Sequence, residues 1–183
     1  MRPVVVLIMG VSGVGKTTLA ECLAAALGWP FQEGDALHSP ENVAKMAAGI
    51  ALSDEDRAPW LDRIGAWIAA RLAAGGGGIV TCSALKRAYR DRLLGPVLLD
   101  PVLLGPIGGR GADVALIYPR ASEAVVAARL AARRGHFMSP ALLASQFATL
   151  EPPDAAEGPL VVDAAQTPAV MCAEALALLA ARA

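Results

Sequence analysis

Apolar residues along this chain occur in two alternating patterns. Short runs that are apolar almost throughout are typical of strands buried on both faces of a sheet, and they span residues 3–9, 29–32, 79–82, 114–118 and 160–162. Longer segments between these runs carry apolar residues at helical spacing. Because short strands alternate with helices, the sequence predicts an α/β fold with a five-stranded parallel sheet and helices on both of its faces.

Capping residues mark several helix ends. Ser39, followed by Pro40 and Glu41, predicts a helix start, and so does Ser53 before an acidic run. The predicted helices span residues 19–27, 40–48, 54–74, 84–94, 122–134, 141–150 and 168–181. Residues 95–111 are rich in Gly, Pro and Leu and are predicted to form a long loop. No repeat or composition change divides residues 1–183, so we expect a single domain.

The loop after the first predicted strand fits the phosphate-binding P-loop pattern G-x-x-x-x-G-K-[ST], because it reads Gly10-Val11-Ser12-Gly13-Val14-Gly15-Lys16-Thr17. The glycines let successive backbone N–H groups point at phosphate oxygens, and the positive end of the following helix strengthens that field. Lys16 would reach the β- and γ-phosphates, and the Thr17 hydroxyl would hold Mg²⁺. We therefore expect the chain to bind a nucleotide phosphate.

Length and charge narrow the class of protein. The chain has 183 residues and a formal net charge of −1, which argues against an electrostatic nucleic-acid binder. No apolar stretch is long enough to span a bilayer, and the P-loop glycines interrupt the N-terminal run that could imitate a signal peptide. We expect no nucleic-acid or membrane partner and a cytoplasmic location. Cys22, Cys82 and Cys172 lack metal-ligand spacing and are expected to be reduced thiols, mostly buried.

Two residues after the second predicted strand could serve the acceptor of a phosphoryl group. Asp35 follows Gly34, and His38 lies in the same turn. A carboxylate at this place can orient an acceptor hydroxyl and take its proton, although an Asp after Gly also caps turns. With a P-loop upstream we favour the functional interpretation of Asp35, whereas His38 by itself is typical of a surface loop.

Basic residues near two further helix starts are candidate anion ligands. Arg57 could hold an acidic group by a bidentate contact, but from local sequence alone an ion pair with Asp54 or Asp56 is favoured. Lys86 and Arg87 begin a helix, where cations oppose the helix dipole, and this favours a ligand over a merely solvated helix start.

Arginines also lie at the end of the helix predicted for residues 122–134. Arg129 and Arg133 share a helix face and could close over the phosphates, with a solvated basic face as the alternative. The third predicted strand, in contrast, carries no acid, so the carboxylate that often supports Mg²⁺ in P-loop proteins is missing there. Thr17 is therefore expected to hold the metal, with Asp35 behind it through water.

Several segments together, in this order, resemble the gluconokinase family over nearly the whole chain. They are MGVSGVGKTT (9–18), EGDALHS (33–39), NVAKM (42–46) with Gly49, DEDRAPWL (54–61), CSALKR (82–87) with YRD (89–91), RGHFM (134–138), and SQF (145–147) leading to LEP (150–152). Many families share the P-loop, but the combination is highly specific.

The resemblance implies an adenylate-kinase-like P-loop NTPase fold, a three-layer sandwich with a mobile lid at about residues 129–140 and a substrate-binding helical region at about 35–74. It implies transfer of the γ-phosphoryl group of ATP, with Mg²⁺, to the 6-hydroxyl of D-gluconate, and a possible homodimer. ATP contacts would come from residues 10–18, Thr18 included, and from an adenine loop near 163–166 that includes Gln166. The resemblance adds catalytic roles for Lys16, Asp35, Arg129 and Arg133, and substrate contacts from Asp35, His38, Arg57, Lys86, Arg87 and His136.

Two other functions compete with this one. A shikimate-type kinase would share the architecture, but such kinases have a Gly-rich turn where this chain has residues 83–87. A nucleotide-binding switch would need neither an Asp at position 35 nor an arginine lid.

Overall fold

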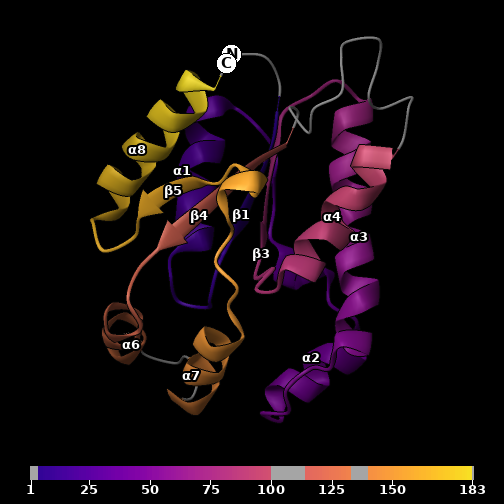
Figure 1. Ribbon diagram of the computed structural model, residues 1–183, viewed down its shortest axis with the longest axis vertical. Coiled ribbons are helices and arrows are strands. Elements are labelled where there is room, and N and C mark those ends of the chain that lie inside the picture. Colours follow the sequence, from indigo (N-terminus) through magenta and orange to yellow (C-terminus); the bar gives the residue numbers. More distant parts are fainter. Residues whose placement is uncertain (1–3, 100–113, 133–139, 183) are drawn as a thin grey trace.

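Five parallel strands form one sheet in the order β2-β3-β1-β4-β5 (Figure 1). The structure is a computed structural model that describes residues 4–99, 114–132 and 140–182. The strands are β1 (Val5–Met9), β2 (Phe31–Gln32), β3 (Gly78–Cys82), β4 (Val114–Arg120) and β5 (Leu160–Asp163). The predicted α/β fold with a five-stranded parallel sheet is therefore confirmed.

The central strand β1 divides the core into two layers. All its residues are buried, and successive side chains point to opposite faces. Val6 and Ile8 belong to the core beneath α1 (Lys16–Leu27) and α8 (Pro168–Ala181). Leu7 and Met9 belong to the core beneath α3 (Asp54–Ala73) and α4 (Arg87–Leu99). Figure 1 shows these two helix pairs on opposite sides of the sheet, which gives the expected three layers.

Three shorter helices lie beyond the carboxyl ends of the strands, as Figure 1 shows for α2, α6 and α7. Their bounds are α2 (Pro40–Ala47), α6 (Glu123–Ala132) and α7 (Pro140–Thr149), and two short 3₁₀ helices span Gly34–Leu37 and Ala155–Glu157. The predicted cap at Ser53 is a complete capping box with Asp56. Asp56 also accepts hydrogen bonds from the Lys45 Nζ atom, at 2.7 and 2.8 Å, and this ties α2 to α3.

Several predicted element ends are wrong, since α1 begins at Lys16 and not at 19, β2 at Phe31 and not at 29, and α4 at Arg87 and not at 84. Helix α4 continues to Leu99, so residues 95–99 are helical and not part of a loop, while residues 100–113 lie outside the described residues. Gly95 and Pro96 suggested a helix end, but local propensity is overridden where helices pack closely, and α3 and α4 approach each other at Gly65 and Leu93. Strand β4 continues through Pro119 to Arg120, because it pairs there with β5 after its pairing with β1 has ended.

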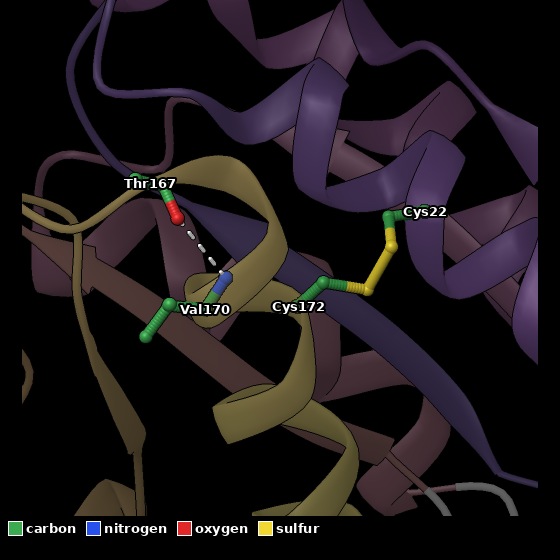
Figure 2. The surroundings of a disulfide bond; sticks show 4 residues. All are labelled: Cys22, Thr167, Val170 and Cys172. Atoms are coloured by element: carbon green, nitrogen blue, oxygen red, sulfur yellow. Dashed lines mark hydrogen bonds between the residues drawn. A yellow bond between two sulfur atoms is a disulfide. The ribbon is translucent and has the colours of Figure 1, made fainter.

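A disulfide joins the two helices of one layer. Cys22 of α1 and Cys172 of α8 are bonded, with their Cα atoms 6.2 Å apart and a sequence separation of 150 (Figure 2). The expectation of three reduced thiols is therefore wrong for this pair, since sequence spacing does not reveal that α1 and α8 are neighbours. Cys82 is a buried free cysteine as expected, and burial raises its pKa to about 12. Among the described residues, no helix is long and apolar enough to cross a membrane.

Removing the disulfide should lower the free energy of unfolding by about 2–5 kcal/mol, because an unfolded chain with so long a closed loop has far less conformational freedom. Urea unfolding of the oxidised protein, the protein in dithiothreitol and Cys22→Ser would measure the difference. The control is Cys22→Ser with and without dithiothreitol, which should unfold identically. Equal stability of all three samples would contradict the prediction.

Candidate active site

The P-loop lies between β1 and α1 and takes the conformation that its glycines allow. Gly10, Gly13 and Gly15 have φ values of 138°, 82° and 108°, a region that other residues rarely adopt. A Cβ atom on Gly13 would lie 2.8 Å from the Leu130 side chain, so α6 packs directly against the loop. Val11 and Val14 point into the core, which leaves the backbone of the loop for phosphate.

Lys16 bends back over the P-loop. Its Nζ atom donates hydrogen bonds to the carbonyl oxygens of Gly10, at 2.9 Å, and Val11, at 3.1 Å. Burial lowers the pKa of Lys16, and the negative charges of Asp35 and Glu33 oppose that shift. The ammonium group therefore lies at the phosphate-binding loop with acidic residues nearby.

A carboxylate that the sequence reading did not single out contacts Thr17. The Thr17 hydroxyl donates to Glu33 Oε2 at 2.7 Å. The other carboxylate oxygen of Glu33 accepts from the hydroxyl of Thr81 on β3, and the Gly34 N–H donates to the same hydroxyl at 3.0 Å. The acid in direct contact with Thr17 is thus Glu33, and the water-mediated support of the metal by Asp35 stays a prediction. Its position just after a strand end was the available signal.

The oxygen atoms at this place suit magnesium. Mg²⁺ prefers hard oxygen ligands and usually keeps several waters, with only one or two protein groups and substrate phosphates. The hydroxyl of Thr17 and the carboxylate of Glu33 fit that description. Within the described ranges there is no cluster of three His, Cys, Asp or Glu residues that could form an all-protein metal cage.

A cavity of about 510 Å³ opens between the P-loop, the α2–α3 region and α7. It brings together predicted residues from distant parts of the sequence, namely Thr17, Asp35, His38 and Arg57. The remaining lining residues are Ser12, Gly13, Met46, Gly49, Ile50, Ala51, Leu52, Trp60, Ser83, Leu85, Tyr89, Leu142, Ser145, Gln146 and Thr149. A nucleotide phosphate and a small acceptor could therefore meet here.

Arg57 is the cation in this cavity that its neighbours leave available. Asp54 accepts from Lys86 and Tyr89, and Asp56 accepts from Lys45, so both expected partners are already bonded. No carboxylate of the described residues forms an ion pair with Arg57, whose guanidinium lies 5.9 Å from the centre of the Tyr89 ring. The helix-face ion pair favoured by local sequence is wrong, and the Arg57 charge is free to meet an anion.

His38 forms part of the cavity wall and rests on Trp60. The two rings are stacked with their centres 4.2 Å apart, and Trp60 Nε1 donates to the Gly34 carbonyl at 2.7 Å. Burial lowers the pKa of His38, so the ring is neutral at pH 7. Its Nδ1 atom is buried without a hydrogen-bond partner. A neutral imidazole at a cavity can donate or accept a hydrogen bond.

Lys86 and Arg87 do not line the cavity. Lys86 is bonded to Asp54 at 2.8 and 2.9 Å, which fixes α4 to the start of α3. The Arg87 guanidinium contacts Asp91 at 3.0 Å and Asp154 at 3.1 Å. Their predicted role in substrate binding stays a prediction, and it would require these ion pairs to open.

Arg129 joins the P-loop to the predicted adenine loop. Its guanidinium donates to the carbonyls of Val14, at 3.4 Å, and Gln166, at 3.1 Å. Thr18 lies in the first turn of α1. Arg133 and His136, and with them most of the predicted lid, lie outside the described residues.

Gln146 of α7 is a further residue that sequence reasoning missed as a site residue. Its side-chain oxygen accepts from the backbone N–H of Ser12 at 2.8 Å, and its amide nitrogen lies 3.3 Å from the Ser12 hydroxyl. An N–H of the phosphate-binding loop is thus held by an oxygen of the protein itself. The only signal in the sequence was its place in the segment SQF (145–147).

The sequence is similar to known proteins over most of its length. Residues 5–153 match the AAA domain family. The chain is 44% identical to a gluconokinase from Gluconobacter oxydans, over 95% of this chain and 90% of that protein. It is 39% identical to the thermosensitive gluconokinase of Escherichia coli, over 85% of this chain and 75% of that protein.

Solved structures are similar to this chain in fold. The crystal structure of a gluconokinase from Sinorhizobium meliloti superposes with a TM-score of 0.83 at 44% identity, covering 98% of this chain and 93% of that one. An APS kinase from Mycobacterium tuberculosis superposes with a TM-score of 0.65 at 18% identity, covering 98% of both chains, and shows the fold alone.

Gly34→Ala should disrupt the site, because a Cβ atom there would lie 1.9 Å from the Thr81 carbonyl oxygen, on backbone that cannot move aside cheaply. We expect a loss of roughly 3 kcal/mol or more in the free energy of unfolding, measured by urea titration. Gly28→Ala is the matched control: its Cβ meets nothing, and its positive φ of 66° alone should cost about 1 kcal/mol. Equal losses in the two variants would refute the steric argument.

Proposed function

This chain belongs to the gluconokinase family, and we propose that it transfers the γ-phosphoryl group of ATP to the 6-hydroxyl of D-gluconate, giving 6-phospho-D-gluconate and ADP. The observation that carries the proposal is Arg57, a cation without a carboxylate partner among the described residues, in a cavity shared with the P-loop and Asp35. Such a cavity suits an acceptor that carries a carboxylate at one end and hydroxyl groups along its length.

ATP would bind through the P-loop backbone of residues 10–17. Lys16 would exchange its two carbonyl bonds for phosphate oxygens. Thr18 in the first helical turn and Gln166 in the loop after β5 would hold the rest of the nucleotide, and Arg129 connects these two parts through its carbonyl contacts. Mg²⁺, held through Thr17, would neutralise charge on the transferring phosphoryl group when bound. Arg133 would add positive charge from the lid.

The acceptor would lie on the other side of the cavity. Arg57 would bind the gluconate carboxylate by paired hydrogen bonds. Asp35 would orient the 6-hydroxyl in line with the γ-phosphate and take its proton. His38, neutral and fixed by its stacking on Trp60, would hydrogen-bond a hydroxyl of the polyol. His136, Lys86 and Arg87 stay further candidates for gluconate contacts.

The competing functions account less well for the cavity. A nucleotide-binding switch has no acceptor. It gives no reason for a cavity beside the phosphate loop in which Arg57 has no ion-pair partner among the described residues. A shikimate-type kinase is not supported by residues 83–87, which lack the Gly-rich turn of such kinases. Nor is it supported by the relatives reported above, which are gluconokinases.

We also propose a cytoplasmic location and keep a homodimer as a prediction. The proposed reaction consumes ATP, which supports the location, while a disulfide such as Cys22–Cys172 is rare in that reducing compartment.

Asp35→Asn should lower kcat by about 10²-fold or more, because the amide keeps the shape of the side chain but cannot take the proton of the acceptor. The measurement is steady-state ADP release with gluconate and ATP. Asp62→Asn is the matched control, since Asp62 is paired with Arg92 on the surface at 2.7 Å, and its kcat should not change. An effect of Asp35→Asn on KM alone would assign the residue to binding and not to proton transfer.

Arg57→Ala should raise the KM for gluconate by roughly 10- to 100-fold, the loss expected for a charge-assisted hydrogen-bonded contact, with the KM for ATP little changed. Arg92→Ala serves as the control for removal of a surface arginine. Sorbitol, which lacks the carboxylate, should be a poor acceptor for both enzymes, so the wild-type preference for gluconate should largely vanish in Arg57→Ala. Absence of ADP release with gluconate in the wild type would refute the proposed function itself.

A further inference from the structure

Strand β3 carries no acid that could support a metal, but it carries Thr81. Thr81 is fully buried, and its hydroxyl lies between two polar groups from the end of β2. It accepts the Gly34 N–H at 3.0 Å and donates to one carboxylate oxygen of Glu33. Because a hydroxyl has a single proton, the bond from Gly34 leaves that proton directed at Glu33. Thr81 therefore fixes where this carboxylate points.

The second oxygen of Glu33 fixes the orientation of Thr17. The Thr17 hydroxyl donates its proton to Glu33 Oε2 at 2.7 Å. A hydroxyl that serves as a metal ligand must offer a lone pair, so its proton needs another acceptor. Glu33 provides that acceptor and leaves the Thr17 lone pairs directed away from it. The chain of bonds runs from β3 through the end of β2 to the first turn of α1.

We propose that Glu33, oriented by Thr81, is the positioning carboxylate of the metal site and replaces the acid that β3 lacks. It acts by orienting the Thr17 hydroxyl so that its oxygen can bind Mg²⁺, and by hydrogen-bonding water molecules that the metal would carry. This inference rests on the proposed use of Mg²⁺-nucleotide, and it is independent of the identity of the acceptor.

The two acids near the end of β2 would then have separate tasks. Asp35 is exposed and lines the acceptor cavity, whereas Glu33 is only partly exposed, is absent from that lining and is bonded to two threonine hydroxyls. Glu33 and Asp35 are two residues apart, with the tightly packed Gly34 between them. This arrangement directs Glu33 at the nucleotide side and Asp35 at the acceptor side.

The alternative is that Glu33 only ties α1 to the sheet. The two roles differ in what they predict for metal dependence. A structural tie would lower thermal stability and leave the effect of Mg²⁺ on nucleotide binding intact. A positioning role would weaken that effect in a protein that remains folded.

The test is calorimetric titration of ADP, in Mg²⁺ and in EDTA, with no acceptor present. We expect wild-type protein to bind ADP more tightly with Mg²⁺. In Glu33→Gln the ratio of the two affinities should fall by about 10-fold or more, the usual effect of losing a group that orients a metal ligand. Metal-free affinity should hold or rise, because a negative charge near the phosphates is gone.

Matched variants locate the effect. Glu21→Gln changes an exposed acid on the same helix as Thr17 and should behave as wild type. Thr81→Ser keeps the hydroxyl and should retain the Mg²⁺ effect, while Thr81→Val should lose part of it. Melting curves identify variants that are merely unstable.

Three results would overturn the proposal. The first is that Mg²⁺ tightens ADP binding by Glu33→Gln as much as it does for the wild type. The second is that Glu33→Gln loses ADP affinity equally with and without the metal. The third is an absence of ADP binding by the wild type, which would refute the proposed function as well. A missing turnover with gluconate, alongside a lost Mg²⁺ effect in Glu33→Gln, would refute only the acceptor assignment.

Discussion

The close contact between Gly34 and Thr81 is the constraint on which the candidate site depends. Strand β2 has two residues and could not define the position of its own end, but the backbone after it is pressed against β3 so tightly that no side chain fits at position 34. Three hydrogen bonds secure the contact. The Gly34 N–H donates to the Thr81 hydroxyl, which itself donates to Glu33, and Trp60 Nε1 donates to the Gly34 carbonyl. This contact fixes the positions of Glu33, Asp35 and the stacked His38. One backbone contact therefore places both the group on the nucleotide side of the site and the groups on the acceptor side.

The distribution of ion pairs explains which cation is left for a ligand. Lys45, Lys86, Arg87, Arg90 and Arg92 are all paired with carboxylates, and these pairs join α2 to α3, α3 to α4, and α4 to the segment before β5. The exposed pairs among them contribute little stability each, whereas Arg90 and Glu157 form a buried pair. The larger effect of the exposed pairs is to occupy the acids around the cavity, Asp54 and Asp56 in particular. Arg57 keeps its charge available because its neighbours in sequence are bonded to partners from other helices.

Much of the fold could be predicted from the sequence, and the site only in part. Apolar strands, caps and the P-loop pattern are local signals, and they correctly predicted five strands, the helix start at Ser53 and the P-loop between β1 and α1. What failed depends on contacts between distant segments. The Cys22–Cys172 bond, the continuation of α4 past Gly95 and the pairing of Asp56 with Lys45 all require knowing which helices are neighbours. Glu33 was missed for the same reason, since only the sheet order places it beside Thr17 and Thr81.

The groups that hold the P-loop in this structure also bear on what ligand it can accept. Lys16 donates to two loop carbonyls, Gln146 accepts the Ser12 N–H, and Arg129 donates to the Val14 carbonyl. A ligand that enters through Lys16 and the Ser12 N–H must replace hydrogen bonds that the protein already makes, so a neutral molecule would gain little from the exchange. A polyphosphate offers several charged oxygens at once, and charge-assisted hydrogen bonds are about twice as strong as neutral ones. The same exchange would release Gln146, and α7 with it, from the loop. Because Gln146 also lines the acceptor cavity, occupation of the loop by phosphate would change the wall against which the acceptor binds.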